Sequence, residues 1–177
     1  MPLKSVVRVC CVAACFCLLS ARPTRAQVPT PVSVLGHTPG DDFYLADYED
    51  TVKYFHSLAA AVPDRMKMFT VGKSTEGRDI EVAVISSTAN IARLDEIKKI
   101  AAQMAHATNL NDGSARDLAR KTPVIVHIDG GLHASEVAGP QHTMMLAYKL
   151  LSAQNEPEID AILNNVVLVL WPTLNPD

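Results

Sequence analysis

The stretch "TPVIVHIDGGLHASEVAGP", residues 122–140, carries the strongest structural signal in this sequence. Its first eight residues are apolar on both alternating faces except at His127 and Asp129, a pattern typical of a strand buried in the middle of a sheet. The two glycines that follow allow a sharp turn. A long helix is then predicted from Val137 to Leu151, because its apolar positions recur and proline is tolerated in a first turn.

The elements predicted on either side indicate an α/β domain with a mixed β-sheet sandwiched by helices. In chain order they are a helix over 43–62 capped by Asp41 or Asp42, an antiparallel hairpin over 66–85, an amphipathic helix over 91–104, a polar connection over 109–121, the strand and helix above, a short helix over 158–163 and a buried strand over 165–171. The last strand opens directly into a loop, so the domain is expected to be a truncated one.

Residues 1–26 have the layout of a secretory signal peptide: basic residues, a short apolar segment, and small residues before a cleavage point after Ala26. An uncleaved anchor and a lipoprotein signal ending at Cys15 are the alternatives. We therefore expect a secreted or periplasmic protein, with an extended segment over residues 27–42 and the domain over 43–177. No stable membrane association is expected after cleavage.

The four cysteines all lie in this leader, so any metal in the mature chain must be held by imidazole and carboxylate groups. The leader also carries four basic residues and no acid. Its removal leaves 12 Lys and Arg against 19 Asp and Glu, a net charge of −7. Such an acidic protein is a poor candidate for binding nucleic acid or an anionic membrane.

His133 and Glu136 are the candidate metal ligands, because a spacing of three lets both side chains converge at the turn after the strand. Both groups suit Zn²⁺, and ligands in α/β proteins bind beyond the carboxyl ends of strands. The alternative is an ordinary strand-to-helix turn in which Glu136 only complements the helix dipole. Spacing alone leaves both interpretations open, since a zinc site needs a third protein ligand.

Three segments, in this order and at these distances, resemble the N-terminal half of the catalytic domain of the zinc carboxypeptidases, the metallocarboxypeptidase family that includes carboxypeptidase A. They are "VGKSTEGRDIEVAVIS", "PVIVHIDGGLHASEVAGP" and "VVLVLWPTLNPD". The resemblance runs from about Phe43 to Asp177. It implies a Zn²⁺-dependent peptidase that acts on peptides or proteins and removes C-terminal residues.

By this resemblance His133 and Glu136 match the first two zinc ligands of the family. The third ligand, the general base and the groups that bind the substrate carboxylate are expected beyond Asp177. Glu136 is not the expected base, because a carboxylate bound to zinc has committed its lone pairs. Ser135 stands where carboxypeptidase A-like enzymes have an arginine, which puts the substrate specificity in doubt.

Other polar residues have more ordinary interpretations. His127 is expected to be a hydrogen-bonded core histidine, and Asp129 either supports the metal site or caps a turn. The loop "KSTEGRD" is expected to be a solvated hairpin tip, with a cleft-lining role as the alternative. On the predicted helix His142 faces away from Glu136 and is expected at the surface or in packing. Partners at ligand spacing are lacking for His37, His56 and His106.

Two other functions remain open at this point. A zinc amidohydrolase or deacylase shares the His-x-x-Glu arrangement but lacks the carboxylate-binding arginines. A truncated, non-catalytic binding module is the alternative from a different class, because residues 1–177 offer only two ligands and two ligands hold zinc weakly. As a hypothesis, the isolated chain is expected to show little peptidase activity.

Overall fold

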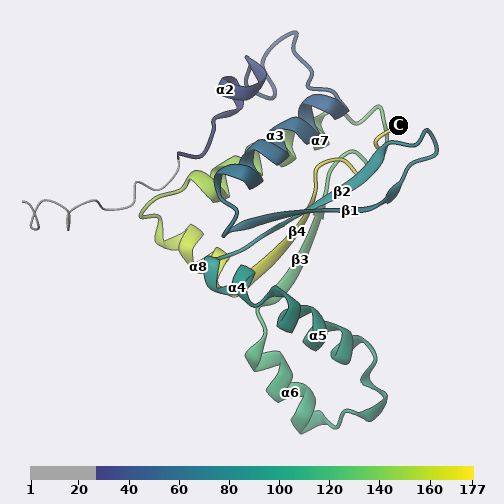
Figure 1. Cartoon of the computed structure of the whole chain (residues 1–177), viewed down its shortest axis with the longest axis vertical. Helices are drawn as coiled ribbons and strands as arrows, with labels where there is room; N and C mark the ends of the chain where they lie inside the picture. Colours follow the sequence, from purple (N-terminus) through teal and green to yellow (C-terminus); the bar gives the residue numbers. More distant parts are fainter. Residues whose placement is uncertain (1–26) are drawn as a thin grey trace, which may run out of the picture.

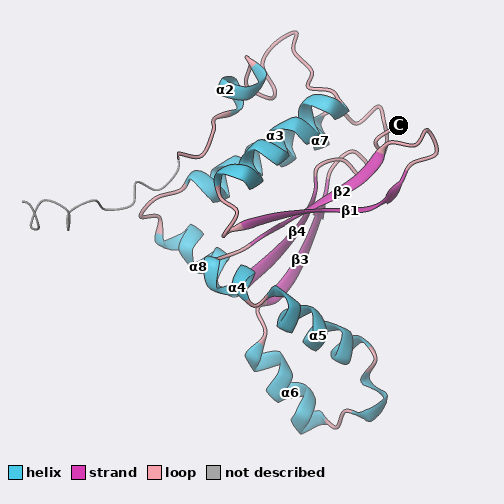
Figure 2. Cartoon of the chain, in the orientation of Figure 1, coloured by secondary structure: helices cyan, strands magenta, loops and turns pink. Residues whose placement is uncertain are grey.

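The computed structural model describes residues 27–177, so the predicted signal peptide over 1–26 lies outside the described residues. Figures 1 and 2 show a sheet with helices packed along it and one helical pair projecting from its end. The elements are α2 (Pro31–Leu35), α3 (Tyr48–Ala61), β1 (Met66–Lys73), β2 (Asp79–Ile85), α4 (Thr88–Ala92), α5 (Leu94–Ala105), a 3-10 turn (Ala107–Asn109), α6 (Asp112–Lys121), β3 (Val124–Asp129), α7 (Ala138–Ser152), α8 (Pro157–Asn165) and β4 (Val166–Trp171).

The sheet has four strands in the order β1-β2-β4-β3. The first two pairs are antiparallel, whereas β3 runs parallel to β4 from Val124 opposite Val166 to Asp129 opposite Trp171. The predicted hairpin is confirmed, with a register irregularity at Val71 between Thr70 and Gly72. The sheet is therefore mixed and flanked by helices, as the sequence pattern predicts.

The main core lies between one face of this sheet and the helices α3, α7 and α8. Tyr54, Phe55, Met144 and Leu151 bring large, fully buried side chains to it. From the sheet, alternate residues of β2 and β4 point into the same layer, as the period of two along a strand requires. This layer fixes the position of the N-terminal ends of α3 and α7 relative to the carboxyl end of β3.

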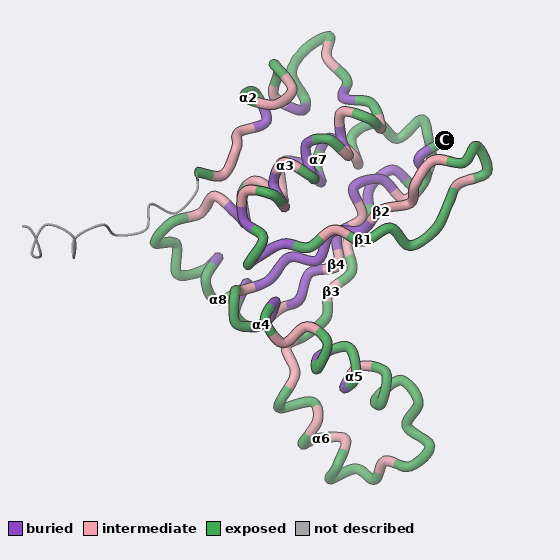
Figure 3. The backbone as a smooth tube through the Cα atoms, viewed as in Figure 1, coloured by how far each residue is buried: buried purple, intermediate pink, exposed green. Residues whose placement is uncertain are grey.

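The opposite face of the sheet is covered only in part. Ile91 and Ile97, from α4 and α5, pack against Val84 and Val167. Beyond them a hollow of about 360 Å³ is lined by apolar residues of all four strands, including Ile125. The helix α6 buries no residue, and Figure 3 shows the α5–α6 pair as largely exposed.

Within residues 27–177 the strand predicted to be central and buried over 122–129 is an outer strand, because β3 stands last in the order of the four-stranded sheet. Val124 is 64% exposed and Ile125 is 46% exposed. His127, predicted to be a core histidine, is exposed as well; its ring lies 5.6 Å from that of Trp171, between centroids. Apolar residues on both faces of a strand do not distinguish an inner strand from an edge strand whose outer side is open.

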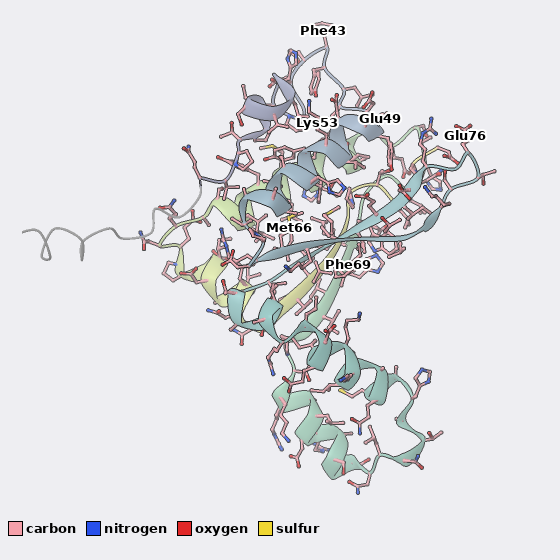
Figure 4. The ribbon with its side chains drawn as sticks, in the orientation of Figure 1. Phe43, Glu49, Lys53, Met66, Phe69 and Glu76 are labelled. Atoms are coloured by element: carbon pink, nitrogen blue, oxygen red, sulfur yellow. The ribbon has the colours of Figure 1, made fainter. Side chains whose placement is uncertain are left out.

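Local boundaries also differ from the predictions. The helix α3 begins at Tyr48, because Asp47 is the residue whose carboxylate accepts the N–H of Asp50, at 2.8 Å. The preceding loop turns at Phe43, which has a φ of 61° and projects into solvent (Figure 4). Residues 27–42 are not extended throughout, since they contain α2.

The two other differences concern the helices before β3. The single helix predicted over 91–104 is divided at Arg93 into α4 and α5. The polar connection over 109–121 contains the ten-residue helix α6, which is capped by Asn111 and ends shortly before β3. None of the helices described in residues 27–177 is long and apolar enough to cross a membrane.

Candidate metal centre

The turn after β3 is built on closely packed glycines. Gly131 has a φ of 66°, and a Cβ atom there would lie 2.6 Å from the Oγ1 of Thr173. A Cβ on Gly130 would lie 2.7 Å from Thr143 Cγ2 and 2.8 Å from the carbonyl oxygen of Gly139. Both positions therefore require glycine, because the strand end passes against the first turn of α7 and the loop after β4.

This turn brings the two predicted ligands together. The Nδ1 atom of His133 lies 2.9 Å from Oε1 of Glu136, and the two side chains are 67% and 60% exposed. The N–H of Glu136 also donates to the carbonyl oxygen of His133, at 3.0 Å. Glu136 thus lies in the turn before α7, not in its first helical turn. The hydrogen bond from His133 holds the pKa of the Glu136 carboxyl below its usual range.

The pair fits a metal ion in its chemistry and spacing. Two ligand atoms of a tetrahedral zinc site, each about 2.0–2.2 Å from the ion, are about 3.3–3.6 Å apart. The distance of 2.9 Å between the imidazole nitrogen and the carboxylate oxygen would have to increase by roughly half an ångström. In residues 27–177, however, no group of three His, Cys, Asp or Glu could hold a metal. The described part of the chain supplies two ligands.

A cavity of about 180 Å³ adjoins the pair. Three segments line it: the start of α3 with the residues before it, the turn that carries His133 and Glu136, and the loop after β4. Its lining residues are Leu45, Ala46, Asp47, Tyr48, Thr51, Gly131, His133, Ala134, Glu136, Val137, Pro140, Gln141, Thr173, Asn175, Pro176 and Asp177. His133 and Glu136 therefore lie in a depression large enough for part of a ligand.

Hydrogen bonds join the walls of this cavity to one another. The buried side chain of Gln141, on α7, accepts the N–H of Ala46 at 3.3 Å and donates to its carbonyl oxygen at 2.9 Å. The N–H groups of Leu174 and Asn175 donate to the carbonyl oxygens of Gly130 and Gly131, at 2.7 and 3.1 Å. The segment before α3 is thus held against α7, and the loop after β4 is held against the turn that carries His133 and Glu136.

The other histidines do not join the candidate centre. His142 is exposed on α7, as expected. His37 stacks on Tyr44, with ring centroids 4.4 Å apart, and the Nε2 of His56 lies 2.8 Å from a carboxylate oxygen of Glu81. Asp129, considered as a support for the site, is exposed on β3 and does not line the cavity.

Sequence reasoning missed one set of contacts at this end of the molecule. The side chain of Asp177 accepts hydrogen bonds from three groups of the β1–β2 hairpin loop: the hydroxyl of Ser74, the N–H of Glu76 and the guanidinium of Arg78. The Glu76 side chain is exposed, in agreement with the predicted solvated tip, but the backbone of the tip and two flanking side chains are bound to the loop after β4. Both segments were prominent in the sequence, yet nothing in either one indicated that they touch.

Comparison with known proteins agrees with the fold and with the motifs. The family model of the zinc carboxypeptidases matches residues 51–177. The carboxypeptidase B of Astacus astacus is 28% identical over 131 residues, which cover 74% of this chain and 32% of that protein. The chain spans about a third of the length of the relatives that it matches.

Two solved structures share the fold. The carboxypeptidase A of Helicoverpa armigera has a TM-score of 0.54 at 21% identity, over 83% of this chain and 31% of its own. Thrombin activatable fibrinolysis inhibitor has a TM-score of 0.56 at 13% identity, over 84% of this chain and 30% of its own. With a family match over most of the described residues and the same mixed sheet, the chain belongs to the zinc carboxypeptidase family.

Proposed function

We propose that this protein takes part in the zinc-dependent hydrolysis of peptide bonds, with removal of C-terminal residues from peptide or protein substrates. The observation that carries the proposal is the convergence of His133 and Glu136, 2.9 Å apart, at the edge of a cavity in a chain of the zinc carboxypeptidase family. The predicted leader over residues 1–26 supports secretion or export to a periplasm as part of the same proposal.

In this proposal His133 and Glu136 hold the ion through an imidazole nitrogen and a carboxylate oxygen. Zinc, when bound, acts as a Lewis acid and lowers the pKa of a bound water to about 7. A glutamate of ordinary pKa is already an anion at neutral pH, and the hydrogen bond from His133 lowers the pKa of Glu136 further. It binds the ion and does not serve as the general base, which the family resemblance places outside this chain together with the third ligand.

The first test measures Zn²⁺ binding to the full chain by competition with a chromogenic chelator. His133→Ala and Glu136→Gln are each expected to weaken binding by about tenfold or more, since each removes one of two ligands. His142→Ala is the matched control, because it removes an exposed histidine from the adjacent helix α7. Equal zinc affinity in all four proteins would refute the assignment of the metal pair.

The second test addresses catalysis by the chain itself. Incubation of the purified chain with peptides and Zn²⁺ is expected to release no C-terminal residues above background, because the described residues supply two ligands and no group of three. Steady, chelator-sensitive release would contradict this expectation and would place a complete site within the chain. The same two-ligand observation favours a second candidate, a non-catalytic binding module. Peptide binding by the full chain, with zinc binding absent, would support that module instead.

A further inference from the structure

Asp177 is the point at which two distant parts of the chain meet. Its Oδ1 accepts the hydroxyl of Ser74 at 2.6 Å and the guanidinium of Arg78 at 3.1 Å, and its Oδ2 accepts the N–H of Glu76 at 2.9 Å. Figure 1 shows the end of the chain beside the β1–β2 hairpin loop, and Figure 4 shows Glu76 at the tip of that loop. The side chain of Asp177 is 18% exposed and that of Arg78 is 36% exposed.

The loop that carries Asp177 is itself bound to the turn of the metal pair. The N–H of Asn175 donates to the carbonyl oxygen of Gly131, two residues before His133. Asn175 and Asp177 line the same cavity as His133 and Glu136. Hydrogen bonds therefore join the hairpin loop to Asp177 and Asn175 to the turn that carries His133 and Glu136, and the backbone through Pro176 connects the two sets.

The hairpin also contacts a second wall of the cavity. The hydroxyl of Tyr48, at the start of α3, donates to the carbonyl oxygen of Asp79 at 2.8 Å. Tyr48 lines the cavity as well. The hairpin thus contacts the α3 wall through Asp79 and the loop after β4 through Ser74, Glu76 and Arg78. These contacts connect two walls of the cavity.

We propose that Asp177 is a positioning residue: it joins the hairpin loop to the loop after β4 and thereby fixes the wall of the cavity beside His133 and Glu136. The inference rests on the proposed function in that it concerns the same metal pair. Asp177 touches neither ligand in this arrangement and acts through Asn175 and Gly131. Three charge-assisted bonds to one carboxylate are stronger and more directional than neutral ones.

Asp177→Asn is the informative variant, because it keeps the shape of the side chain but replaces one acceptor oxygen with a donor and removes the charge opposite Arg78. Asp79→Asn is the matched control. Asp79 lies in the same hairpin and makes an ion pair of 2.8 Å with Lys73, which does not reach the loop after β4. Both variants change the net charge by the same amount.

The first readout is amide hydrogen exchange in the metal-free full chain, measured by NMR. In Asp177→Asn the amides of Glu76 and Asn175 are expected to exchange about tenfold faster or more, because their local opening becomes easier. The amide of Gly77, bound within the hairpin to Ser74 at 3.1 Å, is expected to keep its rate. Asp79→Asn is expected to change none of the three. Unchanged exchange at Glu76 or at Asn175 in Asp177→Asn would overturn the proposal.

The second readout is Zn²⁺ affinity, which is expected to fall by about three- to tenfold in Asp177→Asn and to stay constant in Asp79→Asn. The loss is smaller than the roughly 10–100-fold effect of residues that hydrogen-bond a ligand directly, because Asp177 acts through the backbone. Zinc affinity that stays constant in Asp177→Asn while both amides are released would also overturn the positioning role. If the unmodified chain binds no zinc through His133 and Glu136, the proposed function fails, and exchange at Asn175 in the metal-free chain still decides this inference.

Discussion

Replacement of Gly131 by alanine tests the close packing of the turn that carries His133 and Glu136. Gly131 has a φ of 66°, and the new Cβ would lie 2.6 Å from Thr173 Oγ1 and 2.9 Å from Pro140 Cγ. A left-handed conformation costs a non-glycine residue about 1–2 kcal/mol. Forcing a methyl group into a packed site costs about 1–3 kcal/mol more. Together these terms predict a loss of about 2–5 kcal/mol in the free energy of unfolding.

Gly77→Ala is the matched control for the backbone term. Gly77 has a φ of 85°, but a Cβ there would meet nothing within 4 Å. Its replacement is expected to cost about 1–2 kcal/mol, from the left-handed conformation alone. Both substitutions reduce the entropy of the unfolded chain alike, so this contribution cancels in their difference. The difference of about 1–3 kcal/mol therefore measures the clash at Gly131.

The assay is urea denaturation of the full chain, followed by the fluorescence of Trp171, the only tryptophan in the sequence. Comparable slopes for the two variants would show that the same surface is exposed on unfolding, which makes their free energies comparable. A Gly131→Ala variant as stable as Gly77→Ala, within about 0.5 kcal/mol, would refute the reasoning. It would mean that the turn can move away from Thr173 and Pro140 without cost.

Three further predictions concern other contacts. Gln141→Leu is expected to lower the free energy of unfolding by about 2–4 kcal/mol, because it leaves the N–H and C=O of Ala46 without the Gln141 partner. Urea denaturation measures this loss, and a change below about 0.5 kcal/mol would contradict the prediction. Ile125→Lys is expected to change the free energy of unfolding by less than about 0.5 kcal/mol, because Ile125 is on the exposed outer strand β3. The same variant is expected to reduce self-association measured by light scattering. A loss of more than about 3 kcal/mol in the free energy of unfolding would show a buried strand instead. The hydrogen bond from Ser74, with those from Glu76 and Arg78, lowers the pKa of Asp177. The protection of the Glu76 amide from hydrogen exchange is therefore expected to persist at neutral pH and to be lost as the pH falls below the usual aspartate range of about 4. Protection that is retained when Asp177 is protonated would refute the role of its charge.

Much of the fold followed from local patterns. The alternation over residues 66–85 predicted an antiparallel hairpin, and the recurrence of apolar residues after Pro140 predicted the long helix α7. These patterns are reliable because one face of each element must be buried. The spacing of His133 and Glu136 likewise indicated that the two side chains could meet, since a separation of three residues fixes their relative position within one turn.

Tertiary structure alone decided which strand lies at the edge of the sheet and how the candidate site is enclosed. The apolar residues of β3 are compatible with an inner or an outer strand, because neighbours in a sheet are chosen by non-local pairing and not by the strand's own composition. The bonds between Asp177 and the hairpin loop join residues about a hundred positions apart. No local pattern encodes such a contact, because it exists only after β2, β4 and β3 have aligned and brought both loops to the same end of the sheet.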